Sequence, residues 1–144
     1  KMASLIALGV DDVVPVGELD FSELVLALTE EQGADVVLET VGSPLFPSSL
    51  RSMAQFGRMI MLGEVAGGKT EINLAEVMFR DAKIMGSTGA HRRHTEQASQ
   101  MVAEGLIQPV VHATLPLKDV LIGVGWMATR KLFGRLVLLP NEIG

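Results

Sequence analysis

Three apolar runs in the sequence end in short segments rich in glycine and small polar residues. These segments are Thr40–Ser43, Leu62–Glu64 and Gly86–Gly89. In open α/β sheets ligands bind outside the carboxyl ends of the strands, and glycine lets the backbone come close to a flat ligand. A single glycine after a strand is most simply a turn residue, but three such segments after three strands favour a binding edge.

Two other groups of residues could take part in chemistry. His91, Arg92, Arg93 and His94 could bind an anion or, less plausibly, a metal. A solvated polar turn is the simpler interpretation, because two histidines three residues apart do not make up a zinc site. Glu39 lies in an otherwise apolar strand and needs a partner if it is buried. A catalytic carboxylate is one interpretation, and a hydrogen-bonded structural role is the favoured one.

The composition narrows the classes of protein. The chain has 144 residues, 48% of them hydrophobic and 20% charged, which is the size and apolar content of one compact domain. A formal charge of -5 offers no basic field for nucleic acid. The absence of cysteine excludes disulfides and thiolate metal sites, and cytoplasm is the expected location. The charge-free residues 120–129 are too short to span a bilayer, so we expect no membrane partner.

Strands alternate with helices along the whole pattern. Strands are expected at residues 12–16, 34–40, 58–62, 83–86 and 134–140. The run at 34–40 is nearly continuous, which is typical of a strand covered on both faces. Helices are expected up to a cap at Gly9, from Asp20 to Gly33, after Ser43 as N-cap, around 74–78, from about 95 to 105 and over 117–129.

The helical spacing also predicts which side chains face the core. These side chains are Phe46, Leu50, Met53, Leu74, Val77, Met78, Ala98, Met101, Val102, Val120, Val124 and Met127. Such regular alternation with short connections predicts an α/β, Rossmann-like doubly wound parallel sheet.

A set of short motifs follows in order along the chain. The set is Gly33-Ala34-Asp35-Val36-Val37, Glu39-Thr40-Val41-Gly42, Gly57-Arg58, Leu62-Gly63, Ile84-Met85-Gly86-Ser87, Gly105-Leu106-Ile107-Gln108-Pro109, Leu115-Pro116-Leu117 and Gly134-Arg135-Leu136-Val137-Leu138. No single motif is specific. In their order and spacing, over essentially all 144 residues, they resemble the medium-chain dehydrogenase/reductase family of zinc-type alcohol dehydrogenases.

The resemblance implies an NAD(P)-dependent oxidoreductase that transfers hydride between nicotinamide and an alcohol, carbonyl, quinone or enoyl substrate. Residues 1–144 would then be a partial dinucleotide-binding domain without the catalytic domain, so this chain alone is expected to be inactive. Any zinc would be bound elsewhere in the full-length enzyme, and neither catalytic nor metal-binding residues are expected here. The cofactor-binding residues implied are Val41 and Gly42 near the adenosine side or the ribose, Leu62, Gly63, Glu64, Ser87, Thr88 and Gly89 beside the nicotinamide, and, only in the full enzyme, Arg135 near the cofactor phosphates.

The family's strand order, 3-2-1-4-5-6, would leave this chain without the first two strands. The initial helix lacks an N-cap, so we expect the chain to begin within an element. Without neighbours, residues 1–19 are expected to be disordered, misplaced or swapped. The edge strand 83–87 is expected to pair two copies into a homodimer. The alternative is a non-catalytic module for nucleotide binding or structural association.

Overall fold

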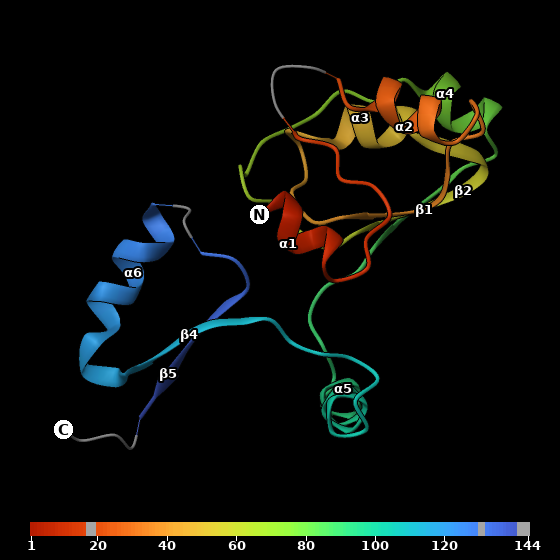
Figure 1. Cartoon of the computed structure of the whole chain (residues 1–144). Helices are drawn as coiled ribbons and strands as arrows, with labels where there is room; N and C mark the ends of the chain where they lie inside the picture. The colour runs from red at the N-terminus through yellow and green to blue at the C-terminus, as the bar shows by residue number, and fades with distance from the viewer. Residues whose placement is uncertain (17–19, 130–131, 141–144) are drawn as a thin grey trace. The chain divides into compact units, whose positions relative to one another are not determined.

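The computed structural model describes residues 1–16, 20–129 and 132–140. The chain forms two compact units, Met2–Gly89 and Ala90–Gly144, with Lys1 assigned to the second (Figure 1). None of the described helices is both long and apolar enough to cross a membrane. The assignment of residues 1–144 to one partial domain stays a prediction.

The unit Met2–Gly89 is built on a parallel sheet of three strands. These are β1 (Ala34–Glu39), β2 (Met53–Met61) and β3 (Lys83–Gly86), in the order β1-β2-β3. The connections run through α3 (Phe46–Arg51) and α4 (Leu74–Phe79). Parallel strands joined by helical crossovers are the repeating unit of a doubly wound fold, so the predicted α/β class and these three strands are confirmed.

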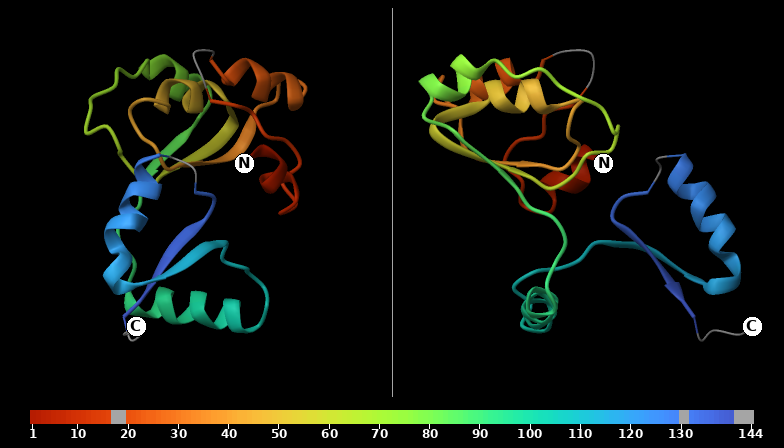
Figure 2. Two further views of the ribbon diagram at one scale, coloured as in Figure 1. Left: turned by 60° about the vertical axis from the view of Figure 1, so that its left-hand side comes forward. Right: turned by 180° about the vertical axis from the view of Figure 1, so that it is seen from behind.

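Helices cover one face of this sheet. α2 (Ser22–Leu28), α3 and α4 lie on the same side of it (Figures 1 and 2). The core under them consists of Phe46, Leu50, Met53 and Met59, with Val37 and Val77 packed against it. This confirms the inward positions predicted for α3. In α4 only Val77 faces this core, because Leu74 and Met78 are exposed.

The other face of β1 is open within this unit. Val36 is 46% exposed and Leu38 is 62% exposed, so the expectation of a strand covered on both faces is wrong for the unit as described. Side chains alternate between the faces of a strand. The helices α2, α3 and α4 take one set of these side chains, which includes Val37, and leave Val36 and Leu38 exposed.

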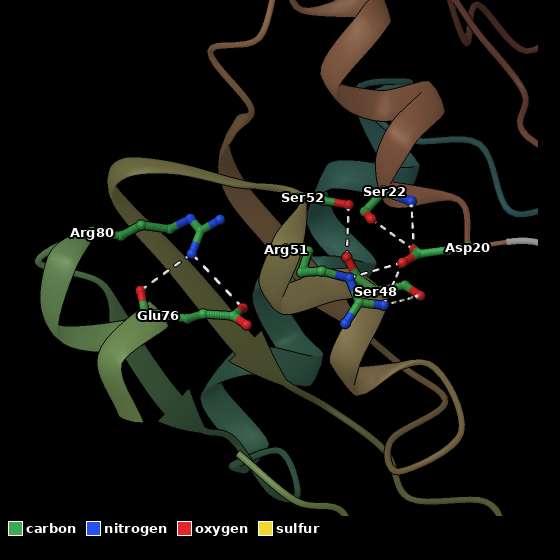
Figure 3. A network of polar contacts seen from close by, with 7 residues as sticks. All are labelled: Asp20, Ser22, Ser48, Arg51, Ser52, Glu76 and Arg80. Carbon is green, nitrogen blue, oxygen red and sulfur yellow. Dashed lines mark hydrogen bonds and ion pairs between the residues drawn. The ribbon is translucent and has the colours of Figure 1, made fainter. Parts of the chain in front are cut away.

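Asp20 joins the start of α2 to α3 (Figure 3). Its carboxylate accepts hydrogen bonds from the Ser22 hydroxyl at 2.7 Å, the Ser22 N–H at 3.0 Å and Arg51 Nε at 2.8 Å. The Ser22 hydroxyl is the main cause that holds the pKa of Asp20 well below its usual range. The helix begins at Ser22 with Phe21 as its N-cap residue, so the start predicted at Asp20 lies two residues too early. The Asp20 carboxylate nevertheless accepts the N–H of the first helical residue and ties α2 to α3.

The ladder between β1 and β2 is interrupted near its start. Ala34 pairs with Met53, but Val36 pairs with Arg58, so β2 has four residues in the interval, 54–57, where β1 has one. Phe56 lies in this bulge with a φ of 61° and is 70% exposed. Its N–H bonds the Arg80 carbonyl at 2.7 Å. The regular ladder then runs from Arg58, where the sequence predicts the strand to begin.

The N-terminal segment contains a helix but joins no sheet. α1 spans Met2–Ile6, and Gly9 follows with a φ of 91° and an N–H bonded to the Ile6 carbonyl. The helix end predicted at Gly9 is confirmed. The strand predicted at residues 12–16 is absent, because an apolar run becomes a strand only beside a neighbour. Residues 1–16 thus lie outside the sheet. The expectation that residues 1–19 are disordered, misplaced or swapped stays a prediction, and 17–19 lie outside the described residues.

The second unit contains a separate pair of parallel strands. β4 (Val111–Pro116) pairs with β5 (Arg135–Leu139), and between them lie a short 3-10 turn (Leu117–Asp119) and α6 (Val120–Ala128). Figure 2 shows α6 beside the two strands. β5 and the helix over 117–129 are confirmed, whereas β4 was not predicted. The described part of the chain therefore forms two small sheets where the sequence predicts one.

The expected inward faces of the helices in this unit are wrong. α5 (Arg92–Ala103) begins before residue 95, and every one of its side chains is exposed, Ala98, Met101 and Val102 included. In α6 the buried residue is Gly123, while Val120, Val124 and Met127 are exposed. Helical spacing shows which side chains share a face, but a face is buried only where something packs against it.

Candidate functional site

The ends of β1, β2 and β3 lie together at the carboxyl edge of the three-stranded sheet. The Leu62 N–H bonds the Glu39 carbonyl at 2.7 Å, and the Ser87 N–H bonds the Met61 carbonyl at 3.0 Å. These bonds hold the three strand ends in line. The structure thus gathers at one edge eight of the nine residues predicted for cofactor binding, which are Val41, Gly42, Leu62, Gly63, Glu64, Ser87, Thr88 and Gly89.

The buried side chain of Glu39 holds the turn that follows β1. Glu39 is the last residue of β1 and only 4% exposed. Its carboxylate accepts the N–H groups of Val41 at 2.8 Å and Gly42 at 3.0 Å, and the hydroxyl of Ser49 from α3. The favoured interpretation of Glu39 as a hydrogen-bonded structural acid is confirmed. Because its oxygens accept hydrogen bonds from its own chain, Glu39 shapes the turn after β1.

Glu64 connects the turn after β1 to the loop after β2. Its exposed carboxylate accepts the Ser43 N–H at 2.6 Å, the Ser43 hydroxyl at 3.0 Å, and the N–H groups of Ala66 at 2.9 Å and Gly67 at 3.0 Å. The Ser43 N–H bond is the main cause that lowers the pKa of Glu64. The side chain is thus held against its own chain.

Ser43 is not the helix N-cap that the sequence predicts. α3 begins at Phe46 after Leu45, and Pro47 lies in its first turn. The Ser43 N–H and hydroxyl go to Glu64, 21 residues further along the chain. Sequence patterns report local partners, and no local signal marks a pair so far apart, so reasoning from the sequence missed it.

The glycines of this edge fall into two kinds. Gly42 has a φ of 89°, and a Cβ on it would lie 2.4 Å from Glu64 Oε2, while a Cβ on Gly63 would lie 2.4 Å from the Thr40 carbonyl oxygen. These two glycines are required by the packing of the chain itself. A Cβ on Gly86 or Gly89 would meet nothing within 4 Å. Open space for a ligand therefore adjoins the end of β3.

The ninth predicted residue, Arg135, belongs to the other unit. It is the exposed first residue of β5, its N–H bonds the Val110 carbonyl at 2.8 Å, and it is in register with Val111. These contacts show its place in the β4–β5 pair. Its predicted position near cofactor phosphates stays a prediction.

The cluster at the start of α5 has the character of a solvated polar turn. The rings of His91 and His94 lie 5.5 Å apart, edge to face, and Arg93 Nε lies 3.2 Å from His94 Nε2. Arg92 pairs with Glu96 one turn along the helix at 2.7 Å, with 91% of its side chain exposed. Exposed pairs of this kind are typical of helix surfaces.

The described residues do not fit a zinc site. Over 1–16, 20–129 and 132–140 no three histidine, aspartate or glutamate side chains gather within reach of one ion, and the sequence contains no cysteine. Structural and catalytic zinc sites in proteins need three or four such ligands. No step of a reaction can therefore be assigned to zinc bound by these residues.

A hollow lies at the other end of the strands, where β1 and β2 begin. It measures about 580 Å³ and is lined by Gly33, Asp35, Met53, Gln55 and Arg80, among others. These residues surround the amino-terminal ends of β1 and β2. Ligands of parallel α/β sheets bind at the carboxyl ends, so we assign the functional site to the strand ends and not to this hollow.

The known proteins that the chain is similar to include a reductase and a dehydrogenase. The chain is 32% identical over 110 residues to acryloyl-coenzyme A reductase of Metallosphaera sedula, covering 76% of this chain and 33% of that protein. It is 30% identical over 139 residues to L-threonine 3-dehydrogenase of Symbiobacterium thermophilum, covering 93% of this chain and 39% of that protein. The chain thus spans between a third and two fifths of these relatives.

Solved structures agree with this similarity. An NAD-dependent alcohol dehydrogenase matches with a TM-score of 0.85 and 32% identity over 96% of this chain and 40% of that one. AibC matches with a TM-score of 0.88 and 31% identity over 97% of this chain and 39% of that one. Residues 1–104 match the family described as zinc-binding dehydrogenase. The predicted resemblance is confirmed, and the chain belongs to the zinc-binding dehydrogenase family.

Proposed function

We propose that the chain is the cofactor-facing part of an NAD(P)-dependent oxidoreductase, which transfers hydride between nicotinamide and an alcohol, carbonyl, quinone or enoyl substrate. The open space beside Gly86 and Gly89, at the carboxyl edge of a parallel sheet, is the observation that supports this best. The names of similar proteins, among them 2-haloacrylate reductase and an NAD-dependent alcohol dehydrogenase, agree with this class of reaction.

The residues that follow the carboxyl ends of β1, β2 and β3 would bind and orient the cofactor. Val41 and Gly42 would adjoin a ribose, while Leu62, Gly63 and Glu64, with Ser87, Thr88 and Gly89, would flank the nicotinamide. Leu62 is 48% exposed and offers an apolar contact, and Ser87 and Thr88 offer hydroxyls to polar atoms. The nicotinamide, when bound, supplies or accepts the hydride. The chain's own part is to hold that ring and limit its access to water.

Four finer points belong to the same proposal. The chain alone is inactive, and any zinc is held by other residues of the full-length enzyme. Two copies pair through β3, which lies at an edge of the three-stranded sheet and has backbone groups free to extend a ladder. Arg135 adjoins the cofactor phosphates. A cytoplasmic location, expected from the cysteine-free sequence, stays a prediction.

A matched pair of glycine variants tests the proposal. Gly89 and Gly105 have φ values of 64° and 73°, and a Cβ on either meets nothing within 4 Å. Replacement by alanine therefore introduces similar backbone strain, but only Gly89→Ala fills space at the proposed site. In the full-length protein we expect Gly89→Ala to weaken NADH or NADPH binding about tenfold and Gly105→Ala to leave it unchanged.

Fluorescence titration with NADH and NADPH measures this, together with turnover of alcohols and carbonyls. If both variants bind NADH and NADPH with equal affinity, the cofactor does not bind beside Gly89 and the proposed site is wrong. A full-length protein that binds neither nucleotide would instead favour a non-catalytic association module.

A further inference from the structure

Three consecutive backbone N–H groups in the turn after β1 are all donated to carboxylates of the chain itself. Glu39 accepts those of Val41 and Gly42, and Glu64 accepts that of Ser43. An N–H group can make one strong hydrogen bond. The N–H groups of Val41, Gly42 and Ser43 are therefore not available to a phosphate, and a ligand meets this part of the turn by close packing.

The donors around Glu64 form an anion receptor. Besides the Ser43 N–H and hydroxyl, the N–H groups of Ala66 and Gly67 point at the same carboxylate. Successive backbone N–H groups that converge in this way make a concave site for an anion. Here the anion comes from within the chain. Because Glu64 is exposed, these four hydrogen bonds hold it, and not burial.

The same contacts fix the position of two glycines. A Cβ on Gly42 would lie 2.8 Å from Glu64 Cα, and a Cβ on Gly68 would lie 2.8 Å from Ser43 Oγ. The turn after β1 and the loop after β2 are thus closely packed around the hydrogen bonds between Glu64 and Ser43. The Val65 N–H adds a bond to the Val41 carbonyl at 2.9 Å. Glu64 supplies the charged part of this junction.

We propose that Glu64 is a positioning residue, an internal anion that locks the turn Val41–Ser43 to the loop Leu62–Gly67 and so sets the shape of the edge that receives the nicotinamide cofactor. The proposal rests on the proposed function. It assigns Glu64 a role through its neighbours and leaves cofactor phosphates to be bound elsewhere.

Variants of Glu64 in the full-length protein test this inference, and added acetate serves as the probe. Glu64→Gln keeps the shape and removes the charge, and Glu64→Ala vacates the receptor. Amide exchange should become about tenfold faster at Ser43, Ala66 and Gly67 in both variants, and NADH affinity should fall about fivefold to tenfold. Glu71→Gln, an exposed glutamate of the same unit, is the control and should change neither quantity.

Chemical rescue separates a charge effect from general loosening. Acetate at tens of millimolar should fill the vacated receptor of Glu64→Ala and restore both amide protection and NADH affinity. It should not restore them in Glu64→Gln, where the amide group occupies the same place. If Glu64→Ala does not fold, Glu64→Asp, which keeps the charge on a shorter side chain, should recover part of what Glu64→Gln loses.

The outcomes distinguish the two proposals. A wild-type protein that binds NADH, with Glu64→Gln and Glu64→Ala binding equally well, would overturn the role of Glu64 and leave the proposed function standing. A wild-type protein that binds no nicotinamide cofactor would overturn both. Faster amide exchange without any acetate rescue would show that Glu64 is an ordinary structural contact.

Discussion

The two units of the chain differ in how their helices are used. In Met2–Gly89, α3 packs its Phe46 and Leu50 onto the strands, and all five buried hydrophobic residues among those described belong to this unit. In the second unit α5 buries no side chain, and α6 buries only Gly123. Hydrophobic burial is the main stabilising contribution in folding. We therefore expect the first unit to be the more stable and the second to depend on fewer contacts.

The comparison also shows why the candidate site is where it is. Catalytic and binding loops need a rigid scaffold under them. The strand ends of the first unit rest on a core and on the buried Glu39. Those of the β4–β5 pair rest on one helix. A precise edge for a cofactor is thus better supported in Met2–Gly89.

The sequence offers a clean probe of this difference. Trp126 is the single tryptophan of the chain and lies in α6 of the second unit. Its fluorescence therefore reports the unfolding of that unit, while far-ultraviolet circular dichroism reports both units. Non-coincident transitions would support separate stabilities.

The largest effect is expected for Met59→Ala. Met59 is fully buried in β2, so its truncation should cost about 2–5 kcal/mol of unfolding free energy by loss of burial and creation of a cavity. Urea unfolding followed by circular dichroism measures the loss, and the Trp126 transition should stay in place. Met127→Ala, at a position 61% exposed, is the control and should change stability by less than about 0.5 kcal/mol. Equal effects of the two variants would contradict the contrast between the units.

A smaller effect, confined to the second unit, is expected for Gly134→Ala. Gly134 has a φ of 91°, and a Cβ there would lie 2.4 Å from the Val110 carbonyl oxygen. The backbone strain and this contact together should cost about 2 kcal/mol. The Trp126 fluorescence transition and amide exchange at Arg135 measure it. Gly105→Ala introduces similar backbone strain without the contact, so it should lower the unfolding free energy by less. If both variants lower it equally, the contact with the Val110 carbonyl does not contribute.

The smallest effect is expected for Asp20→Asn. The side chains of Asp20 and Arg51 are 34% and 40% exposed, so at pH 7 the pair should contribute only about 0.5 kcal/mol to the stability of the first unit. Because the pKa of Asp20 is lowered in the folded chain, this stability is present above the unfolded value of about 4. It is lost as the pH falls through the lower folded value.

Urea titrations at pH 7 and pH 3 check this sign. The difference between wild type and Asp20→Asn should shrink at the lower pH, and Asp11→Asn, in an exposed loop, should show no such trend. A difference that grows on acidification would contradict the assignment.

The sequence predicted the elements whose neighbours are also in the chain. The apolar runs at 34–40, 58–62 and 83–86 pair with one another. Their hydrophobic pattern and composition were therefore sufficient to predict them as strands. The run at 12–16 is also rich in valine, but it contains Pro15, which cannot donate to a ladder, and no described strand pairs with it. Helical spacing in α5 correctly predicted a helix and wrongly predicted its buried face, because burial depends on what lies opposite.

The same division holds for the site. The strand ends were predictable because every parallel sheet brings its carboxyl ends to one edge. The role of Glu39 followed from an acid inside an apolar strand, which must find hydrogen bonds. The bond of Glu64 to Ser43 was not predictable, since exposed acids and serines are common and only the folded chain brings these two together.

The bulge at residues 54–57 divides the pairing of β1 and β2 into two parts. These four residues leave the β1–β2 ladder after Met53, and the register resumes at Arg58. A shift of pairing by one residue would turn every side chain of a strand to the opposite face. The continuous pairs from Arg58 to Met61, and not the isolated pair at Met53, therefore align β2 with the candidate site at its carboxyl end.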